Sequence, residues 1–192
     1  RLTKQLEATK DEFPYRKWND LYLIYRSILP NQSEDLVTTM LISNFIMKRL
    51  KFTEEELFQF AKTNTAKRTG IIVTPLSNPF RNEMSAKTDI WNFSDDTSDS
   101  TILSNRNLMN GAALILCDEV MDKVVEHYKV NVLYILPSSI HEVIIIPDSD
   151  SVDVEYLKNM VYEINRSTVA PEERLSDHVY KYTCATKSFE ML

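Results

Sequence analysis

Short apolar runs bounded by turn residues recur in the second half of the chain, a pattern typical of β-strands. The runs "VNVLYIL" and "IHEVIII" flank the turn sequence "PSS", which predicts a β-hairpin over residues 130–147. Both faces of the second hairpin strand are apolar beyond the turn, so we expect this strand to be covered on each side. Other short apolar runs predict strands at residues 100–105, 111–116 and 178–184.

The same half contains two stretches with helical spacing of apolar residues. One covers residues 119–129, with Asp118 as the expected cap, and its buried stripe would be Val120, Met121, Val124, Val125 and Tyr128. The other begins at Asp150 or Ser151 and continues past Val161. Helices and strands therefore interleave in this half.

The first half shows one strong local signal, the sequence "FTEEELFQFAKTN". Thr53 can cap a helix while Glu56, three residues later, bonds back to the cap. Around it, the pattern predicts a short helix within residues 1–13, strands at 21–29 and 38–43, and an extended piece at 71–76.

A polar stretch without periodicity, residues 77–100, separates the two halves. A loop of this length within a compact domain is unusual, so we interpret it as an exposed boundary between two lobes. The predicted organisation is an N-terminal α/β lobe at residues 1–76, continuing a missing upstream region, and a C-terminal α+β lobe at residues 101–192. Because hairpins recur, the predicted fold class is α+β, with a mostly antiparallel sheet and packed helices.

Composition and charge exclude several classes of protein. The chain has 192 residues, 43% of them hydrophobic and 26% charged, as in ordinary globular proteins. Its net charge of −6 argues against a broad nucleic-acid-binding surface. Apolar runs are too short to cross a bilayer, and two distant cysteines fit a reducing compartment, so we expect a cytoplasmic protein without membrane contact. Only two glycines occur, which excludes glycine-rich phosphate loops, and we expect no cofactor.

His141 and Glu142 stand side by side at the start of an apolar run. In a strand, His141 would share its face with Val143, whereas Glu142 would share the opposite face with Ile144. The two neighbours would then point apart and could not form a catalytic pair. We expect a histidine bonded to the turn backbone and a glutamate at the rim of the sheet; the alternative is a pocket wall that presents one of them to a ligand.

A second group of polar residues, "EERLSDH", precedes the last predicted strand. Asp177 and His178 resemble half of an acid–base pair, but a catalytic role would require convergence with His141. We favour the alternative, in which Ser176 or Asp177 caps a turn by accepting from backbone N–H groups. No metal-binding spacing is present, so we expect no metal site. The remaining polar candidates, which could contact a ligand, are Asn110, Ser138, Ser139, Glu172 and Glu173.

The sequences "NGAALIL", "LYILPSSIHEVIIIPD", "INRSTVAPEE" and "LSDHVYKY" resemble an uncharacterised bacterial family, domain of unknown function 5688. The likeness extends upstream through "DLYLIYRSIL" and "TTMLISNFIMKRLKFTEEELFQFAKTNT". The resemblance implies no established activity, cofactor or catalytic residue; it implies soluble bacterial proteins, some on mobile elements, that often have a further N-terminal region. The positions that match the family's motifs are Asn110, Gly111, Pro137, Ser138, Ser139, His141, Glu142, Pro171, Glu172, Asp177 and His178.

These observations favour a non-enzymatic protein that binds a protein or a small molecule, in the context of a mobile element or of defence. The alternative is a hydrolase or a metal-dependent enzyme that brings together His141, Glu142, Asp177 and His178. The oligomeric state cannot be read from the sequence.

Overall fold

A mixed sheet of seven strands forms the centre of the molecule. The computed structural model describes residues 1–4, 12–29, 38–78, 88–137 and 139–192. All neighbouring strands of the sheet are antiparallel except the last two, which are parallel. In spatial order the strands are β12 (Ser188–Met191), β11 (Tyr180–Thr183), β9 (Val132–Leu136), β10 (Val143–Pro147), β8 (Thr101–Ser104), β6 (Ile72–Pro75) and β7 (Ile90–Trp91).

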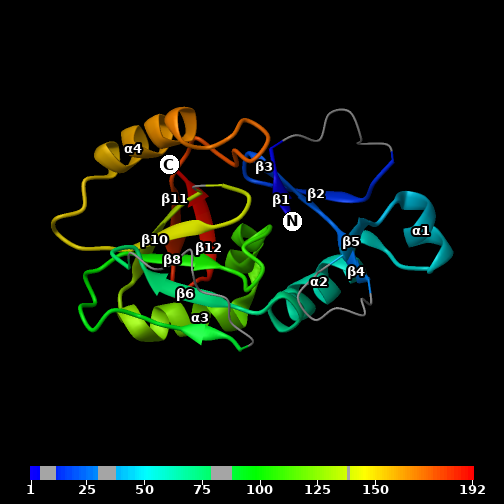
Figure 1. Cartoon of the computed structure of the whole chain (residues 1–192), viewed down its shortest axis with the longest axis horizontal. Coiled ribbons are helices and arrows are strands. Elements are labelled where there is room, and N and C mark those ends of the chain that lie inside the picture. The colour runs from blue at the N-terminus through cyan, green and yellow to red at the C-terminus, as the bar shows by residue number, and fades with distance from the viewer. Residues whose placement is uncertain (5–11, 30–37, 79–87, 138) are drawn as a thin grey trace.

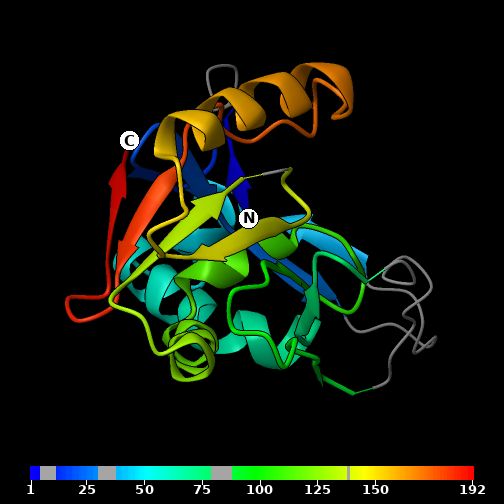
Figure 2. The same ribbon diagram turned by 90° about the vertical axis from the view of Figure 1, so that its left-hand side faces the viewer.

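Helices cover both faces of this sheet, as Figures 1 and 2 show. On one face lie α3 (Asp118–Tyr128) and the 3₁₀ helix η2 (Gly111–Leu116), and on the other lies α4 (Val154–Ser167). Because side chains alternate along a strand, Val143 and Ile145 of β10 join the core beneath α3, whereas Ile144 packs with α4. The prediction that this strand is covered on both sides is confirmed.

The N-terminal part adds two small sheets and two helices. β1 (Leu2–Thr3), β3 (Leu21–Ile24) and β2 (Tyr15–Trp18) form one sheet, and β4 (Arg26–Leu29) pairs with β5 (Thr38–Leu41) in the other. The helix α1 (Asn44–Arg49) follows, and α2 (Glu54–Thr69) leads from this region to the large sheet (Figure 1).

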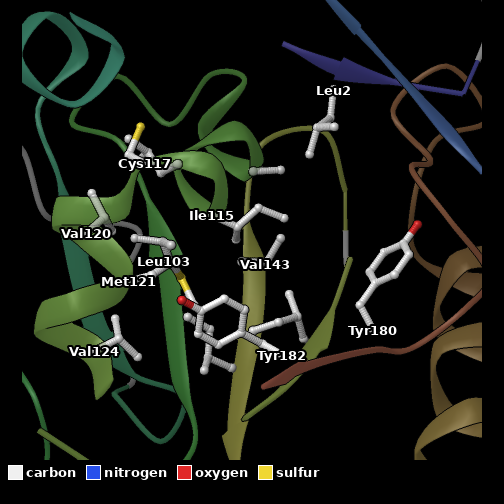
Figure 3. Packing of buried hydrophobic residues seen from close by; sticks show 14 of the residues in the cluster. Leu2, Leu103, Ile115, Cys117, Val120, Met121, Val124, Val143, Tyr180 and Tyr182 are labelled. Carbon is white, nitrogen blue, oxygen red and sulfur yellow. The ribbon is translucent and has the colours of Figure 1, made fainter. Parts of the chain in front are cut away.

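The three-stranded sheet packs against the same core as the C-terminal elements. Leu2, Leu21 and Leu23 are buried in one cluster with residues of α3 and of the central strands. Figure 3 shows Leu2 and Tyr180 among the buried residues of this cluster. The strand β6 lies in the predicted first lobe yet belongs to the large sheet, so the sheet crosses the predicted lobe boundary.

Local sequence signals account for several of these elements. Thr53 caps α2, with its side chain accepting from the Glu56 backbone N–H (3.2 Å) and the Glu56 carboxylate accepting from the Thr53 N–H (2.7 Å), as predicted. β9 and β10 form the predicted hairpin. α4 begins slightly later than predicted, because Asp153 rather than Asp150 or Ser151 provides the cap.

The structure corrects the prediction of a strand at residues 111–116. This apolar run is the 3₁₀ helix η2, in which five of the six residues are buried. An apolar run that is buried on all sides has no periodicity to distinguish a strand from a helix. Asp118 is also not a cap: it is the first residue of α3, whose N-cap residue, Cys117, makes no side-chain cap bond.

Four further expectations differ from the structure. Residues 2–3 form β1 where a helix was predicted, and residues 5–11 of that predicted helix lie outside the described residues. The strand predicted at residues 21–29 is two strands, separated at Tyr25. The polar stretch 77–100 contains β7, which pairs with β6, and the strand predicted at residues 178–184 is followed by β12.

Candidate functional site

The hairpin end places His141 in a turn and not in a strand. β10 begins at Val143, so the predicted alternation of His141 and Glu142 across a strand is wrong. The Nδ1 atom of His141 accepts from the backbone N–H of Asn110 (3.2 Å), and its Nε2 lies 3.3 Å from the Glu173 carboxylate. Since Nδ1 accepts, the ring proton belongs on Nε2, where it can be donated to Glu173. Both ring nitrogens are therefore engaged in joining three segments of the chain.

The backbone of His141 is held as firmly as its ring. Its N–H donates to Ser139 Oγ (3.0 Å), and its carbonyl accepts from Ser104 Oγ (2.9 Å). The buried Ser139 is thus used within the turn, and Ser138 lies outside the described residues. The ring of His141 is bonded to backbone, but to that of Asn110 in a separate loop and not to the hairpin turn as expected.

Gly111 lies against this turn, where there is no room for a side chain. A Cβ atom there would lie 2.5 Å from the His141 carbonyl oxygen and 2.7 Å from the Asn105 nitrogen. Contacts this close involve backbone atoms that cannot rotate away. The glycine therefore lets η2 approach the hairpin.

The loop from Asn105 to Asn110 is shaped by its own side chains. Asn105 is 2% exposed; its Oδ1 accepts from the N–H groups of Asn107 and Met109 (3.1 Å each), and its Nδ2 donates to the Met109 carbonyl (2.7 Å). Asn110 has a left-handed backbone conformation, with φ of 59° and ψ of 25°, which asparagine tolerates better than most residues. These bonds and the backbone conformation of Asn110 fix the shape of the loop.

A second polar cluster surrounds Asp20, a residue that sequence reasoning missed. Ser176 Oγ donates to Asp20 Oδ2 (2.7 Å), the Tyr180 hydroxyl donates to Asp20 Oδ1, and His178 Nδ1 lies 3.3 Å from both Asp20 Oδ2 and Ser176 Oγ. Burial, followed by the bond to Asp20, raises the pKa of Tyr180. Asp20 and His178 are 158 positions apart, so only the short "WND" turn could have drawn attention to this residue.

The Asp20 cluster contains serine, histidine and aspartate, but not in the arrangement of a catalytic triad. In a triad the serine and the acid bond opposite nitrogens of the ring, whereas here both contact Nδ1. Ser176 is also 1% exposed, out of reach of a substrate. The cluster joins the turn between β2 and β3 to β11.

The partners of the Asp177 carboxylate in the described residues do not include either histidine. Its Oδ1 accepts from Asn165 Nδ2 (3.1 Å), and its Oδ2 lies 3.6 Å from Lys4 Nζ and 3.7 Å from an Arg166 nitrogen. Burial alone would raise the pKa of Asp177, but the bond from Asn165 and the charges of Lys4 and Arg166 lower it below its usual value. Asp177 therefore acts as an ionised anchor for α4.

The hairpin end and the segment before β11 do meet, through a bond from the Ile140 N–H to the Glu173 carbonyl (2.8 Å). Yet His141 pairs with Glu173, while His178 pairs with Asp20. In the ranges that the structure describes, no three His, Cys, Asp or Glu side chains are grouped so that they could hold a metal ion. The four candidates His141, Glu142, Asp177 and His178 do not build one catalytic centre there.

A cavity of about 750 Å³ lies beside the Asn105–Asn110 loop. Its walls come from β3, β4, α2, this loop and the adjacent η2. Most lining side chains are apolar, and the described lining residues include four basic residues and no acidic ones. The apolar lining includes Leu23, Leu29, Leu57, Phe58, Phe60 and Leu116.

One predicted binding candidate, Asn110, lines the cavity directly. His141 stands behind it and holds its backbone, and Glu173 in turn contacts His141. Three residues singled out in the sequence therefore line this wall or contact it from behind. Arg26 belongs to β4, Lys62 and Arg68 belong to α2, and Arg1 precedes β1, so the basic residues of the wall lie far along the chain from the polar motifs.

The cavity also contains a cysteine, Cys117, at its η2 wall. Burial raises the pKa of its thiol to about 11, so the thiol is protonated at neutral pH. A protonated thiol is a poor nucleophile and behaves as a small apolar group.

The fold and the cavity define an α+β protein with a central sheet covered on both faces and a lined cavity at its N-terminal side. A family model matches residues 3–184, and the chain belongs to that family, described as a family of unknown function (DUF5688). No curated protein matches the chain, and no solved structure matches it. Among the helices that the structure describes, none is long and apolar enough to span a membrane.

Proposed function

We propose that this protein binds a small molecule in the cavity beside the Asn105–Asn110 loop and does not catalyse a reaction on it. The observation that carries the proposal is the cavity, whose volume of about 750 Å³ falls within the range of small-molecule sites, roughly 300–1,000 Å³. A mainly apolar lining with a few polar groups is also typical of such sites.

The polar groups near the cavity support binding better than catalysis. Each ring nitrogen of His141 faces a partner, and the Cys117 thiol is protonated. A general base must reach the proton it removes, and a nucleophile must be activated. These pairings do not favour the hydrolase or metal-dependent enzyme considered from the sequence.

A binding protein in a reducing compartment such as the cytoplasm fits the state of the cysteines. Cys117 and Cys184 are both free thiols. Disulfides are rare where glutathione keeps thiols reduced.

A role in a mobile element or in defence is proposed from the family resemblance.

Titration with N-phenyl-1-naphthylamine, a neutral dye that fluoresces in apolar surroundings, tests the proposal. We expect saturable binding to the folded protein, and weaker binding by about tenfold or more once Ala61→Phe fills the cavity. Thr63→Phe is the matched control, because Thr63 is exposed on the same helix and does not line the cavity. Equal affinity of the dye for both variants, or no saturable binding to the parent protein, would reject the cavity as the binding site.

A further inference from the structure

The basic residues of the cavity are its most unusual feature, because the chain as a whole is acidic. It has 28 acidic and 22 basic residues, yet the described lining of the cavity has Arg1, Arg26, Lys62 and Arg68 and no aspartate or glutamate. A hollow lined by charges of one sign, with apolar walls, focuses their field on whatever enters it. The cavity therefore favours an anion.

Two cavity arginines, Arg26 and Arg68, differ in their partners from Arg16 and Arg166, although Arg174 outside the cavity also donates to neutral carbonyl groups. Arg16 is paired with Glu54 and Glu55, and Arg166 lies near Asp177. Arg26 instead donates to the Thr39 hydroxyl (2.7 Å), and no carboxylate within the described part of the chain lies within ion-pair distance of Arg26 or Arg68. A guanidinium held in place by a neutral partner keeps its charge available for a ligand.

The surroundings of Arg1 add to this surplus of positive charge. Its Nε atom is buried and has no hydrogen-bond partner among the described residues. Burial, and then the nearby charge of Arg26, lower the pKa of the Arg1 guanidinium. An anion between these groups would reduce their repulsion.

The remaining walls fit an apolar body attached to the charged group. Leu57, Phe58 and Leu116 line the cavity, and the exposed Leu50 and Phe60 extend its apolar surface outward. A purely polar anion would leave this surface in contact with water, at the cost of the hydrophobic stabilisation that an apolar body would supply.

We propose that the ligand is a small anionic amphiphile, with a carboxylate or phosphate head group held near Arg26 and Arg68 and an apolar body against α2 and η2. This inference rests on the proposed function, since it names the chemical class that the cavity accepts. Lys62 contributes less, because its ammonium group is paired with Asp118 (2.8 Å).

Two dyes that differ by one charged group test this inference. 8-Anilinonaphthalene-1-sulfonate is N-phenyl-1-naphthylamine with an added sulfonate, so the ratio of their affinities isolates the charge. We expect the sulfonate dye to bind about tenfold more tightly at low salt and to lose this advantage as the salt concentration rises. Equal affinities would overturn the inference while leaving the proposed function intact, whereas failure of both dyes to bind would reject the proposed function itself.

Charge variants locate the effect. We expect Arg26→Gln to weaken the sulfonate dye by about tenfold and the more exposed Arg68→Gln by about threefold, without change for the neutral dye. Lys67→Gln is the matched control, since Lys67 neighbours Arg68 on α2 but does not line the cavity. An equal loss in Lys67→Gln would show a general charge effect and overturn the inference.

Arg26→Lys retains the charge and should retain most of the affinity. A loss equal to that of Arg26→Gln, with folding intact by circular dichroism, would refute a charge role for Arg26.

Competition with natural-type amphiphiles distinguishes the two head groups. Dodecanoate and dodecyl phosphate should displace the sulfonate dye from the parent protein, and dodecanol should do so much less well. Displacement by only one of the two anions would identify the head group. Displacement by dodecanol at the same concentration as by both anions would overturn the inference.

Discussion

A methyl group added at Gly111 would collide with the backbone that holds the cavity wall. In Gly111→Ala, the new carbon would lie 2.5 Å from the His141 carbonyl oxygen, 2.7 Å from the Asn105 nitrogen and 2.7 Å from the Ser104 hydroxyl. Overpacking of this kind costs about 1–3 kcal/mol. Moving the turn to make room would also weaken the bond between Ser104 and His141, at about 1 kcal/mol for a typical bond. We expect the free energy of unfolding to fall by about 2–4 kcal/mol.

Urea denaturation, followed by far-UV circular dichroism, measures this loss as a shift of the midpoint at constant slope. Asn110→Gly is the matched control at the preceding position. Glycine adopts the left-handed conformation of Asn110 without strain, and the backbone N–H that donates to His141 is kept, so we expect a change within about 0.5 kcal/mol. If Gly111→Ala were as stable as Asn110→Gly, the close approach of η2 to the hairpin would not hold this wall. Gly111→Ala should also bind the sulfonate dye less tightly, because Asn110, which lines the cavity, would move with the turn.

Three further outcomes follow from the structure. Thr53→Ala should remove the cap of α2 and lower the free energy of unfolding by about 1 kcal/mol, while Thr53→Ser should not; equal melting curves for both would refute the cap. The folded-state pKa of Asp177 is lowered, so its contribution to stability is complete above its unfolded pKa of about 3.9 and is lost as pH falls toward the folded value. Asp177→Asn should therefore destabilise the protein more at pH 6 than at pH 3. An effect that does not change with pH would contradict this. Cys117, whose thiol pKa is raised to about 11, should react with Ellman's reagent at pH 8 much more slowly than in urea; equal rates would show that the thiol is accessible.

Local sequence patterns were sufficient wherever an element is determined by residues close to it in the chain. The capping box of α2 involves only Thr53 and Glu56, and the hairpin involves two apolar runs joined by a short turn. α3 and α4 each show one apolar face, and both are present. The α+β class follows from these elements and is confirmed.

Elements whose form depends on distant contacts could not be predicted in the same way. Five of the six residues at 111–116 are buried, and the hairpin end lies so close to Gly111 that no side chain would fit there. The strand predicted at residues 21–29 breaks at Tyr25, whose hydroxyl bonds Glu54 of α2. β7 has two residues, too few for any alternation to be visible.

For the candidate site residues too, contacts between distant positions could not be predicted from the sequence. The side chain of His141 contacts Glu173 and the Asn110 backbone, at separations of 32 and 31 positions along the chain. Their residue types drew attention in the sequence, but the pairing that makes them structural appears only in the fold. The arginines of the cavity carried no motif at all, since an arginine on a strand or helix is ordinary until its neighbours are known.

The two polar clusters and the cavity differ in whether their polar side chains already have partners. The clusters around His141 and Asp20 use their histidines, serines and carboxylates to join distant segments, so these residues have few groups left for chemistry. In the cavity the relation is reversed: Arg26 is held in position by Thr39, and Arg68 has no acidic partner in the described residues. Because an unpaired charge next to apolar walls lacks full hydration, a ligand that supplies the opposite charge gains more there than at an open surface. Because the cavity arginines lack acidic partners while the histidines are already bonded, we propose the cavity as the binding site and a structural role for His141 and His178.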